Sequence, residues 1–456
     1  MSEFDFLNLA VSQWQLLLIL VLACVGTTWW ALKKYMVAGI YDPLFFVLGV
    51  SYAINYGVIL LLLVNGLVSI FLFVTLAAYA VVLFVAIRHF SAKTSPPLVL
   101  RMMTTIAPVR FGNAVFWAAL LLYMALAYVI VSTIGFGLFA ETNRFDVARG
   151  YGSLIRVLDC LTPFIVSFIT LYGLRSRNAA IIAIFTVSAF ILLAAVVNGA
   201  KVSVLFSFIT VLLTLFVGRP GFRIARWQVV AAVSLGLMFS LLALKVNLDK
   251  NNVADQANGP LSNVSNLVVV RLVYRIIAFG DTSYLVLPND VIDHLQTDSL
   301  AVRFAAPLIG NTNLSSFLGY DVSNYTVGRQ AVLIQTADTA VFGGPTSHFD
   351  LFAYVYLGPL GGLFFVLAIG ILLGQLNRSV LRVKNSTTLR ANPYLVALSV
   401  TVWTRAVLIL MEPGVGFAYI IDAFVIFPAL SLIGGLVAGA GKTETPPGAI
   451  SEQGPA

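Results

Sequence analysis

Arg271 and Arg275 are four residues apart in the stretch 265–276, whose apolar pattern predicts a helix. Side chains four apart on a helix share a face, so both guanidinium groups project from one side, next to Tyr274. Guanidinium groups bind phosphate or carboxylate through paired N–H donors. The spacing therefore predicts a site for an anion. The alternative is an amphipathic helix on the membrane surface, whose arginines reach lipid headgroups.

Three further cations, Arg156, Lys201 and Arg405, lie at or within the ends of apolar stretches. A charge there needs a partner or a water-filled cavity. Asp159 and Asp422 lie within reach, so ion pairs Arg156–Asp159 and Arg405–Asp422 that hold helices together are the alternative to ligand binding. Lys201 opens a stretch whose first turns hold no acidic residue, and we expect it to face a cavity. Arg303, in the polar segment of the chain, is a further candidate for substrate binding.

His348 follows a rigid turn at 343–347 and precedes the next apolar stretch, two residues before Asp350. Imidazole titrates near neutral pH, so a histidine at the mouth of a helix can give or accept a proton. We therefore treat His348 as a candidate catalytic residue, together with Arg275 of the predicted anion site. The alternative for His348 is a structural histidine that caps the helix.

Motifs for a metal or a nucleotide are missing from the sequence. The 3 histidines and 2 cysteines show no ligand spacing, and neither an Asp-Xaa-Asp pair nor a glycine-rich phosphate loop occurs. We expect no metal site, no cofactor and no nucleic-acid partner. An activity driven by ATP is disfavoured for the same reason.

The elements that must position these residues are membrane helices. The chain of 456 residues is 60% hydrophobic and 10% charged, with a mean hydropathy of +0.96, whereas soluble domains carry about 25% charged residues. The composition predicts an all-α, polytopic transmembrane helical bundle. At roughly 20 residues for each crossing, about eleven spans are expected, at 14–32, 44–64, 66–87, 112–138, 153–174, 179–198, 202–218, 228–247, 350–373, 393–411 and 417–440.

Basic residues alternate between the loops of this topology. The loops at one end hold Lys33, Lys34, Arg88, Lys93, Arg101, Arg110, Arg175, Arg177, Arg219, Arg223, Arg226, Arg378, Arg382, Lys384, Arg390 and Lys442. Cytoplasmic loops carry an excess of Lys and Arg, so these loops are expected inside, with the amino terminus periplasmic and the carboxy terminus cytoplasmic.

This topology divides the chain into four parts. They are spans one to eight (1–247), a large periplasmic loop with short amphipathic helices (248–349), the last three spans (350–440) and a disordered cytoplasmic tail (441–456). The loop alternates apolar stretches with polar turns, which suggests that it packs on the membrane face.

Two stretches resemble signatures of the O-antigen polymerase and O-antigen ligase superfamily, whose members have a GT-C-like architecture. Residues 198–213 resemble the family's helix start, in which a small residue precedes a basic one, although Lys201 stands where the family usually has arginine. Residues 347–362 resemble its second signature, a polar residue, often histidine, followed by a glycine pair, here Gly358 and Gly361. The large outer loop with arginines shortly before a helix is a third shared trait.

The resemblance implies a metal-independent glycosyltransferase in a bacterial inner membrane. Its donor would be an oligosaccharide linked to polyprenyl pyrophosphate, its acceptor a second such lipid, and a chain-length regulator a possible partner. Carried over, Lys201 and Arg275, assisted by Arg271, would grip the pyrophosphate, and His348 would contact the acceptor hydroxyl or the same phosphate. Tyr274 would stack on a sugar, unless it belongs to the interfacial aromatic belt.

Two other functions compete with a polymerase. A ligase that transfers the finished glycan to a lipid acceptor belongs to the same class, and the sequence barely separates the two. A transporter or flippase of an anionic lipid-linked solute belongs to another class. Transporters usually keep ionisable groups near the midplane and carry inverted repeats, whereas here the stray cations gather at one face and no repeat is visible.

Overall fold

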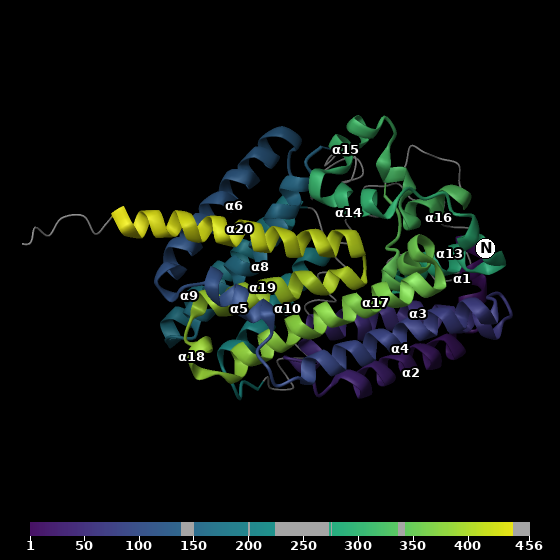
Figure 1. Ribbon diagram of the computed structural model, residues 1–456, viewed down its shortest axis with the longest axis horizontal. Helices are drawn as coiled ribbons and strands as arrows, with labels where there is room; N and C mark the ends of the chain where they lie inside the picture. Colours follow the sequence, from purple (N-terminus) through teal and green to yellow (C-terminus); the bar gives the residue numbers. More distant parts are fainter. Residues whose placement is uncertain (138–149, 199–200, 224–272, 275, 336–342, 441–456) are drawn as a thin grey trace, which may run out of the picture.

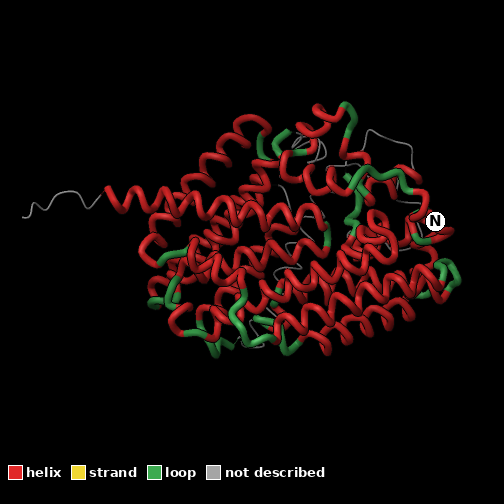
Figure 2. Tube along the Cα trace, in the orientation of Figure 1, coloured by secondary structure: helices red, strands yellow, loops and turns green. Residues whose placement is uncertain are grey.

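The fold is all-helical, as predicted. The computed structural model describes residues 1–137, 150–198, 201–223, 273–274, 276–335 and 343–440, and within these ranges every regular element is a helix. Figure 2 shows long helices joined mostly by short loops at the two ends of a bundle. The predicted anion-binding arginines, Arg271 and Arg275, lie outside the described residues, as does the tail 441–456.

Nine helices of the described part are long and apolar enough to cross a membrane. They are α2 (Trp14–Leu32), η2 with α3 (Phe45–Tyr52 and Ala53–Val64), α4 (Ile70–Ala92), η3 with α6 (Val109–Phe111 and Gly112–Ile134), α8 (Gly152–Gly173), α9 (Arg177–Asn198), α17 (His348–Asn385), α19 with η9 (Pro393–Ala406 and Val407–Leu410) and α20 (Pro413–Ala440). A shorter apolar helix, α10 (Lys201–Gly218), coincides with the predicted seventh span. The predicted eighth span, 228–247, lies outside the described residues.

Helix α19 is the buried centre of the bundle. It contacts α8, α10, α17 and α20, and 89% of its span is buried. Peripheral α2 is the opposite case, with 11% of its span buried and large apolar side chains such as Ile19 and Trp30 exposed. Apolar side chains on such a surface match a lipid environment, which supports a multi-pass membrane protein.

The bundle has two distinct ends, which we call outer and inner after the predicted orientation. The outer end carries α1 (Glu3–Ser12), α13 (Asp281–Val286), α14 (Leu300–Ile309), α15 (Asn311–Leu318) and α16 (Val327–Gln335), and the inner end carries α5 (Leu98–Ile106) and α18 (Thr387–Arg390). In Figure 1 the outer end lies to the right, near the N terminus, and α18 lies at the left.

The described part of the large loop packs directly on the outer end. Helix α13 contacts α1, α3 and α16, and the rings of Phe6 and Tyr284 stack with centroids 4.2 Å apart. The Ser283 hydroxyl donates to Asn55 Oδ1 of α3 at 2.6 Å, and α14 contacts α20. The loop therefore rests on the helix ends, and its residues are positioned by the bundle.

Helix α17 is interrupted at Gly358, whose φ of 66° and ψ of −178° suit only glycine in an otherwise helical run. Pro359 follows and cannot donate the backbone hydrogen bond that would bridge the break. The Tyr79 hydroxyl of α4 lies 2.9 Å from the carbonyl oxygens of both Gly358 and Pro359 and shares its hydrogen between them. The break divides α17 into a short outer segment and a long segment that packs along α4.

Candidate functional site

The segment 405–422 joins α19 to α20 at the outer end. It includes Arg405 and contacts three other candidate site residues, Arg156, Arg303 and His348. Asp422 binds Arg156. The carbonyl oxygen of Met411 accepts a hydrogen bond from the backbone N–H of His348. Gly414 packs so closely on the backbone of Arg303 that an added Cβ would lie 2.5 Å from the Arg303 carbonyl oxygen. We call this segment the outer connection. This role of the segment could not be predicted from the sequence, because its contacts come from residues more than 60 positions away.

Arg156 and Asp422 form a two-pronged ion pair between α8 and α20. The Arg156 Nε donates to Asp422 Oδ2 at 2.5 Å and its Nη2 to Oδ1 at 3.1 Å. Both side chains are about nine-tenths buried, with 10% and 11% exposed. The same Nη2 lies 3.4 Å from the carbonyl oxygen of Leu308, which ties the loop helix α14 to the pair.

A second pair joins α19 to α8. Arg405 Nη2 lies 3.8 Å from Asp159 Oδ1, and the Tyr419 hydroxyl of α20 donates to Asp159 Oδ2 at 3.0 Å. The Arg405 guanidinium also lies 5.0 Å from the centre of the Tyr419 ring, a cation–π contact. Asp159 is therefore held from two neighbouring helices at once.

The predicted ion pairs exchange their partners. The sequence predicts Arg156 with Asp159 and Arg405 with Asp422, but the structure pairs Arg156 with Asp422 and Arg405 with Asp159. On α8, Arg156 and Asp159 share a face that packs against α19 and α20, so each charge finds a partner across the interface. The exchange matters because pairs between helices fix three helices together, whereas a pair within α8 would fix none.

We call Arg156, Asp159, Arg405, Tyr419 and Asp422 the outer cluster. Its two guanidinium groups and two carboxylates have a formal net charge of zero, yet some of its hydrogen-bond donors have no acceptor among the described residues. Arg156 Nη1, Arg405 Nε and the neighbouring Thr404 Oγ1 are buried and have no hydrogen-bond partner in the described part of the chain. Buried donors normally find acceptors, so this set of donors is suited to the oxygens of an anionic ligand.

Arg303 binds other residues of the large loop. Its Nη2 makes a short contact with Asp298 Oδ2 and donates to the carbonyl oxygen of Val322 at 2.9 Å. Burial raises the pKa of Asp298, although the bond from Arg303 works against that rise. Arg303 Nε has no partner within the described ranges, but its other contacts assign the side chain to holding α14 against η8 (Val322–Tyr325).

His348 is enclosed where three segments meet. It is 1% exposed, and its backbone adopts a φ of 54°, in the left-handed region. Its Nε2 lies 3.0 Å from the carbonyl oxygen of Phe279 and must carry the proton, since a carbonyl only accepts. Nδ1 is buried without a partner in the described residues, so it is the only ring atom that could accept a proton. The bond to Phe279 ties the start of α17 to the loop segment that precedes α13.

Ser347 and Glu412 close the same junction. The backbone N–H and the hydroxyl of Ser347 donate to Glu412 Oε2 at 3.3 and 3.1 Å. Burial raises the pKa of Glu412, and the bonds from Ser347 and the charge of Arg303 oppose that rise. Sequence reasoning missed Glu412, Tyr419 and Thr404 as members of the site. The spacing of three between Tyr419 and Asp422 on one apolar helix was the one available signal.

Lys201 can be placed by its backbone alone. It begins α10, which contacts α8 and α19. The Thr214 hydroxyl of α10 donates to Ser167 Oγ of α8 at 2.9 Å. Both helices run from the outer to the inner end, so counting back equally from this bond places Lys201 level with Leu154. The start of α10 therefore shares a level with the outer cluster.

The candidate sugar-stacking residue Tyr274 is also described, and its side chain is partly buried.

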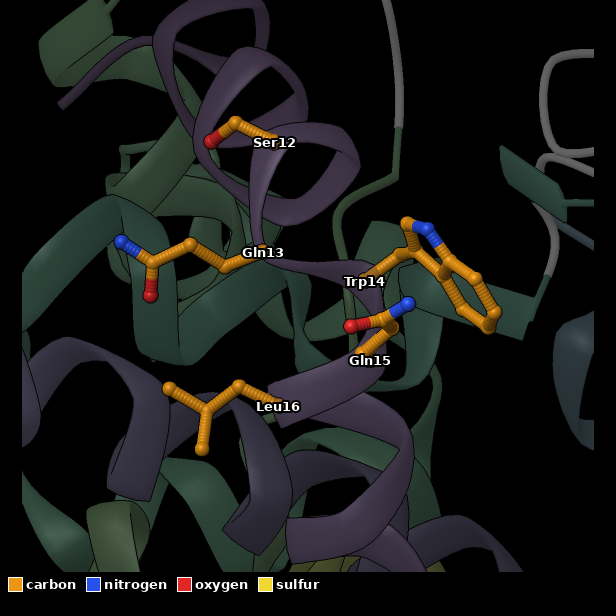
Figure 3. Close-up of a pocket in the computed structure, with 5 residues that line it drawn as sticks. All are labelled: Ser12, Gln13, Trp14, Gln15 and Leu16. Carbon is orange, nitrogen blue, oxygen red and sulfur yellow. The ribbon is translucent and has the colours of Figure 1, made fainter.

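Two surface hollows lie away from the outer cluster. One, of about 370 Å³, is lined by Ser12, Gln13, Trp14, Gln15 and Leu16 at the junction of α1 and α2. In Figure 3, the side chains of Gln13 and Trp14 point to opposite sides of this junction. The other, of about 250 Å³, lies beside the break at Gly358, with Asp293, Thr297 and Tyr354 among its lining residues. Neither hollow is lined by a Lys or Arg side chain.

Among the described residues, no group of three or more His, Cys, Asp or Glu side chains could hold a metal.

No protein-family model, no curated protein and no solved structure matches the chain.

Proposed function

We propose that the chain is a membrane glycosyltransferase of the O-antigen or exopolysaccharide polymerase type in a bacterial inner membrane. It would transfer a glycan from polyprenyl pyrophosphate to the end of a second lipid-linked repeat unit on the periplasmic face. The helical, multi-pass architecture is compatible with a substrate that has a lipid tail. The resemblance of residues 198–213 and 347–362 to the superfamily supports the same function.

One observation carries the proposal: three buried donors that have no partner among the described residues, Arg156 Nη1, Arg405 Nε and Thr404 Oγ1, lie at one end of the bundle. A pyrophosphate leaving group has acceptor oxygens for all of them. Charge-assisted bonds from guanidinium to phosphate are about twice as strong as neutral hydrogen bonds. Donors aimed at the charge that develops on a leaving group are usually the largest catalytic contribution.

The cross-linked frame of the outer cluster gives this binding its geometry. Asp422 grips Arg156 through two bonds, so the free Nη1 is held in one direction. Tyr419 and Asp159 hold the Arg405 guanidinium from two sides. Preorganised donors need no reorientation when the glycosidic bond breaks. In this proposal Lys201, Arg271 and Arg275 add further positive charge, and a general base, His348 through Nδ1 being the candidate, accepts the proton of the acceptor hydroxyl.

A transporter of an anionic lipid-linked solute is the second candidate, because of the break in α17. Discontinuous helices line the substrate sites of many transporters, and Gly358–Pro359 makes such a discontinuity. The outer cluster disfavours this function, since its charges lie at one end and lock three helices together. A ligase would use the same donor site with a different acceptor.

The test is turnover by the purified full-length chain in detergent, with lipid-pyrophosphate repeat units as the only substrate and a chelator present. A polymerase yields a ladder of lengthening products. A ligase yields no ladder until a separate lipid acceptor is added. Failure to lengthen any of a panel of repeat units, combined with movement of the lipid-linked unit across vesicles containing the protein, would establish the transporter instead.

A further inference from the structure

Arg378, near the inner end of α17, is a buried cation for which the described residues supply no counter-charge. Its residue surface is 6% exposed. Both Nε and Nη1 are buried and have no hydrogen-bond partner, and no ion pair involves the side chain within the described ranges. Burying a charge without a counter-charge costs free energy that a folded protein normally avoids. Arg378 therefore indicates an anion that comes from outside the described part of the chain.

Among the described residues, the inner end has no carboxylate that could pair with this arginine. Asp42 is the only acidic residue that the described ranges place there. It is fully buried and accepts hydrogen bonds from the backbone N–H groups of Val37, Ala38 and Leu44 and from Trp403 Nε1. The nearest charge along α17, Arg382, has the same sign as Arg378 and lies one turn away on the same face.

The depth of Arg378 fits the headgroup level of a membrane. The long segment of α17 begins at Pro359, after the break. Arg378 lies 19 residues further on, about 30 Å at 1.5 Å for each residue, which is the thickness of a bilayer's hydrocarbon core. If the break marks the outer boundary of the core, Arg378 lies where the phosphates of the inner leaflet are found.

Helix α5 packs against the bundle at the same end. It contacts α17, α19 and α20, and its Leu100 and Met103 are buried against the bundle. On its other side, Leu98 is 65% exposed and Met102 45% exposed, with Arg101 beside them also exposed. A short amphipathic helix with exposed apolar residues and an exposed cation is typical of a segment in the membrane interface.

We propose that the inner end of α17 binds the phosphate group of an anionic phospholipid. Arg378 donates from Nε and Nη1 to the phosphate oxygens, Arg382 adds the second positive charge, and the exposed apolar face of α5 contacts the acyl chains. The site lies at the opposite end of the bundle from the outer cluster. It is independent of the proposed glycosyl transfer and does not require it.

The experiment measures thermal unfolding of the full-length protein in a neutral detergent. Phosphatidylglycerol, phosphatidylcholine and inorganic phosphate are added separately to the wild type, Arg378→Met and the control Arg390→Met. Phosphatidylglycerol should raise the midpoint of the wild type and of Arg390→Met by roughly 3 °C or more above the effect of phosphatidylcholine. Arg378→Met should lose most of that difference. The control is matched because Arg390 is a cation of the same end whose guanidinium already donates to the carbonyl oxygen of Lys384 at 2.8 Å.

Three outcomes would overturn the site. They are equal stabilisation of the wild type by the two lipids, a full response of Arg378→Met, and stabilisation by inorganic phosphate as strong as by phosphatidylglycerol, which would indicate a soluble anion. If Arg378→Met does not fold, native mass spectrometry of the wild type replaces it. The site then predicts preferential retention of one phosphatidylglycerol over phosphatidylcholine, and equal retention of both would contradict it.

Discussion

The two ends of the bundle treat their cations in different ways. At the outer end, Arg156, Arg405 and Arg303 each contact a carboxylate. At the inner end, Lys384 donates to the carbonyl oxygen of Val37 and Arg390 to that of Lys384, while Lys93 lies 4.2 Å from the centre of the Phe90 ring. Arg378 has no partner within the described part of the chain.

This difference separates two uses of positive charge. The outer cations are fixed by carboxylates from neighbouring helices, which leaves a few donors in defined positions. Such a frame suits binding of a particular group in a particular orientation. The inner cations named above instead bind backbone carbonyl oxygens or an aromatic ring, or in the case of Arg378 no described group. None of them forms an ion pair among the described residues, which suits attraction to a negatively charged membrane surface.

The largest predicted effect comes from breaking one outer pair. Arg156→Leu should reduce the free energy of unfolding by about 3–5 kcal/mol, because it leaves the Asp422 carboxylate buried without its partner. Arg156→Leu/Asp422→Leu should recover most of that loss, since no charge then remains unpaired. Reversible unfolding in mixed micelles, with both variants and the wild type, measures the difference.

If the double variant is as unstable as Arg156→Leu, the loss of stability does not come from an unpaired buried carboxylate. The ion pair itself would then stabilise the fold more than two apolar side chains do. The outer end would then owe its order to the ion pairs themselves. The distinction decides whether the outer cluster is a frame or merely a neutralised set of charges.

Sequence reasoning reached the helices more easily than the site. Nine of the eleven predicted spans coincide with long helices of the described part, because about 20 apolar residues can satisfy their backbone only as a helix in a membrane. The seventh coincides with the shorter α10, and the eighth lies outside the described residues. The predicted charged residues Arg156 and Arg405 do meet at the outer end with both predicted carboxylates. The choice of partner was wrong because it depends on how α8, α19 and α20 face one another, which no spacing along the chain specifies.

His348 illustrates a different limit of the sequence. Its position at the start of a long helix was predicted correctly, and α17 begins there. Its enclosure by Phe279 and Met411 could not be predicted, because these contacts come from chain segments 69 and 63 residues away. A motif shows which residue type stands at a helix end, but packing decides which of its atoms remain free.

A smaller effect is predicted for the pH dependence of stability. The raised pKa of Glu412 means that the folded state binds its proton more tightly than the unfolded state does. Its contribution is therefore fully present below the unfolded pKa and is lost as the pH rises through the folded one. Unfolding midpoints measured across this range should fall more for the wild type than for Glu412→Gln.

The comparison of the two proteins isolates Glu412 from Asp298 and Asp42, whose pKa values are also raised by burial. Identical pH profiles for the wild type and Glu412→Gln would contradict the assignment. The carboxyl would then be ionised equally in both states, and the junction with Ser347 would not depend on its protonation.

The smallest effect is expected at the inner end. Arg390→Leu removes one hydrogen bond to a backbone carbonyl and should change the free energy of unfolding by roughly 0.5–1.5 kcal/mol. The same unfolding assay checks it beside Arg156→Leu. A loss at Arg390 as large as the loss at Arg156 would remove the contrast between the two ends.

The central claim, that the outer cluster binds a pyrophosphate group, is tested most directly by affinity for a short-chain prenyl pyrophosphate. Arg405→Lys keeps the charge beside Asp159 but removes the free Nε, and Arg390→Lys makes the same exchange at the inner end. Arg405→Lys should bind about tenfold more weakly than the wild type, the loss expected for one charge-assisted hydrogen bond, whereas Arg390→Lys should keep the wild-type affinity. Equal affinity of all three proteins for the pyrophosphate, or equal binding of the prenyl alcohol by the wild type, would contradict the claim.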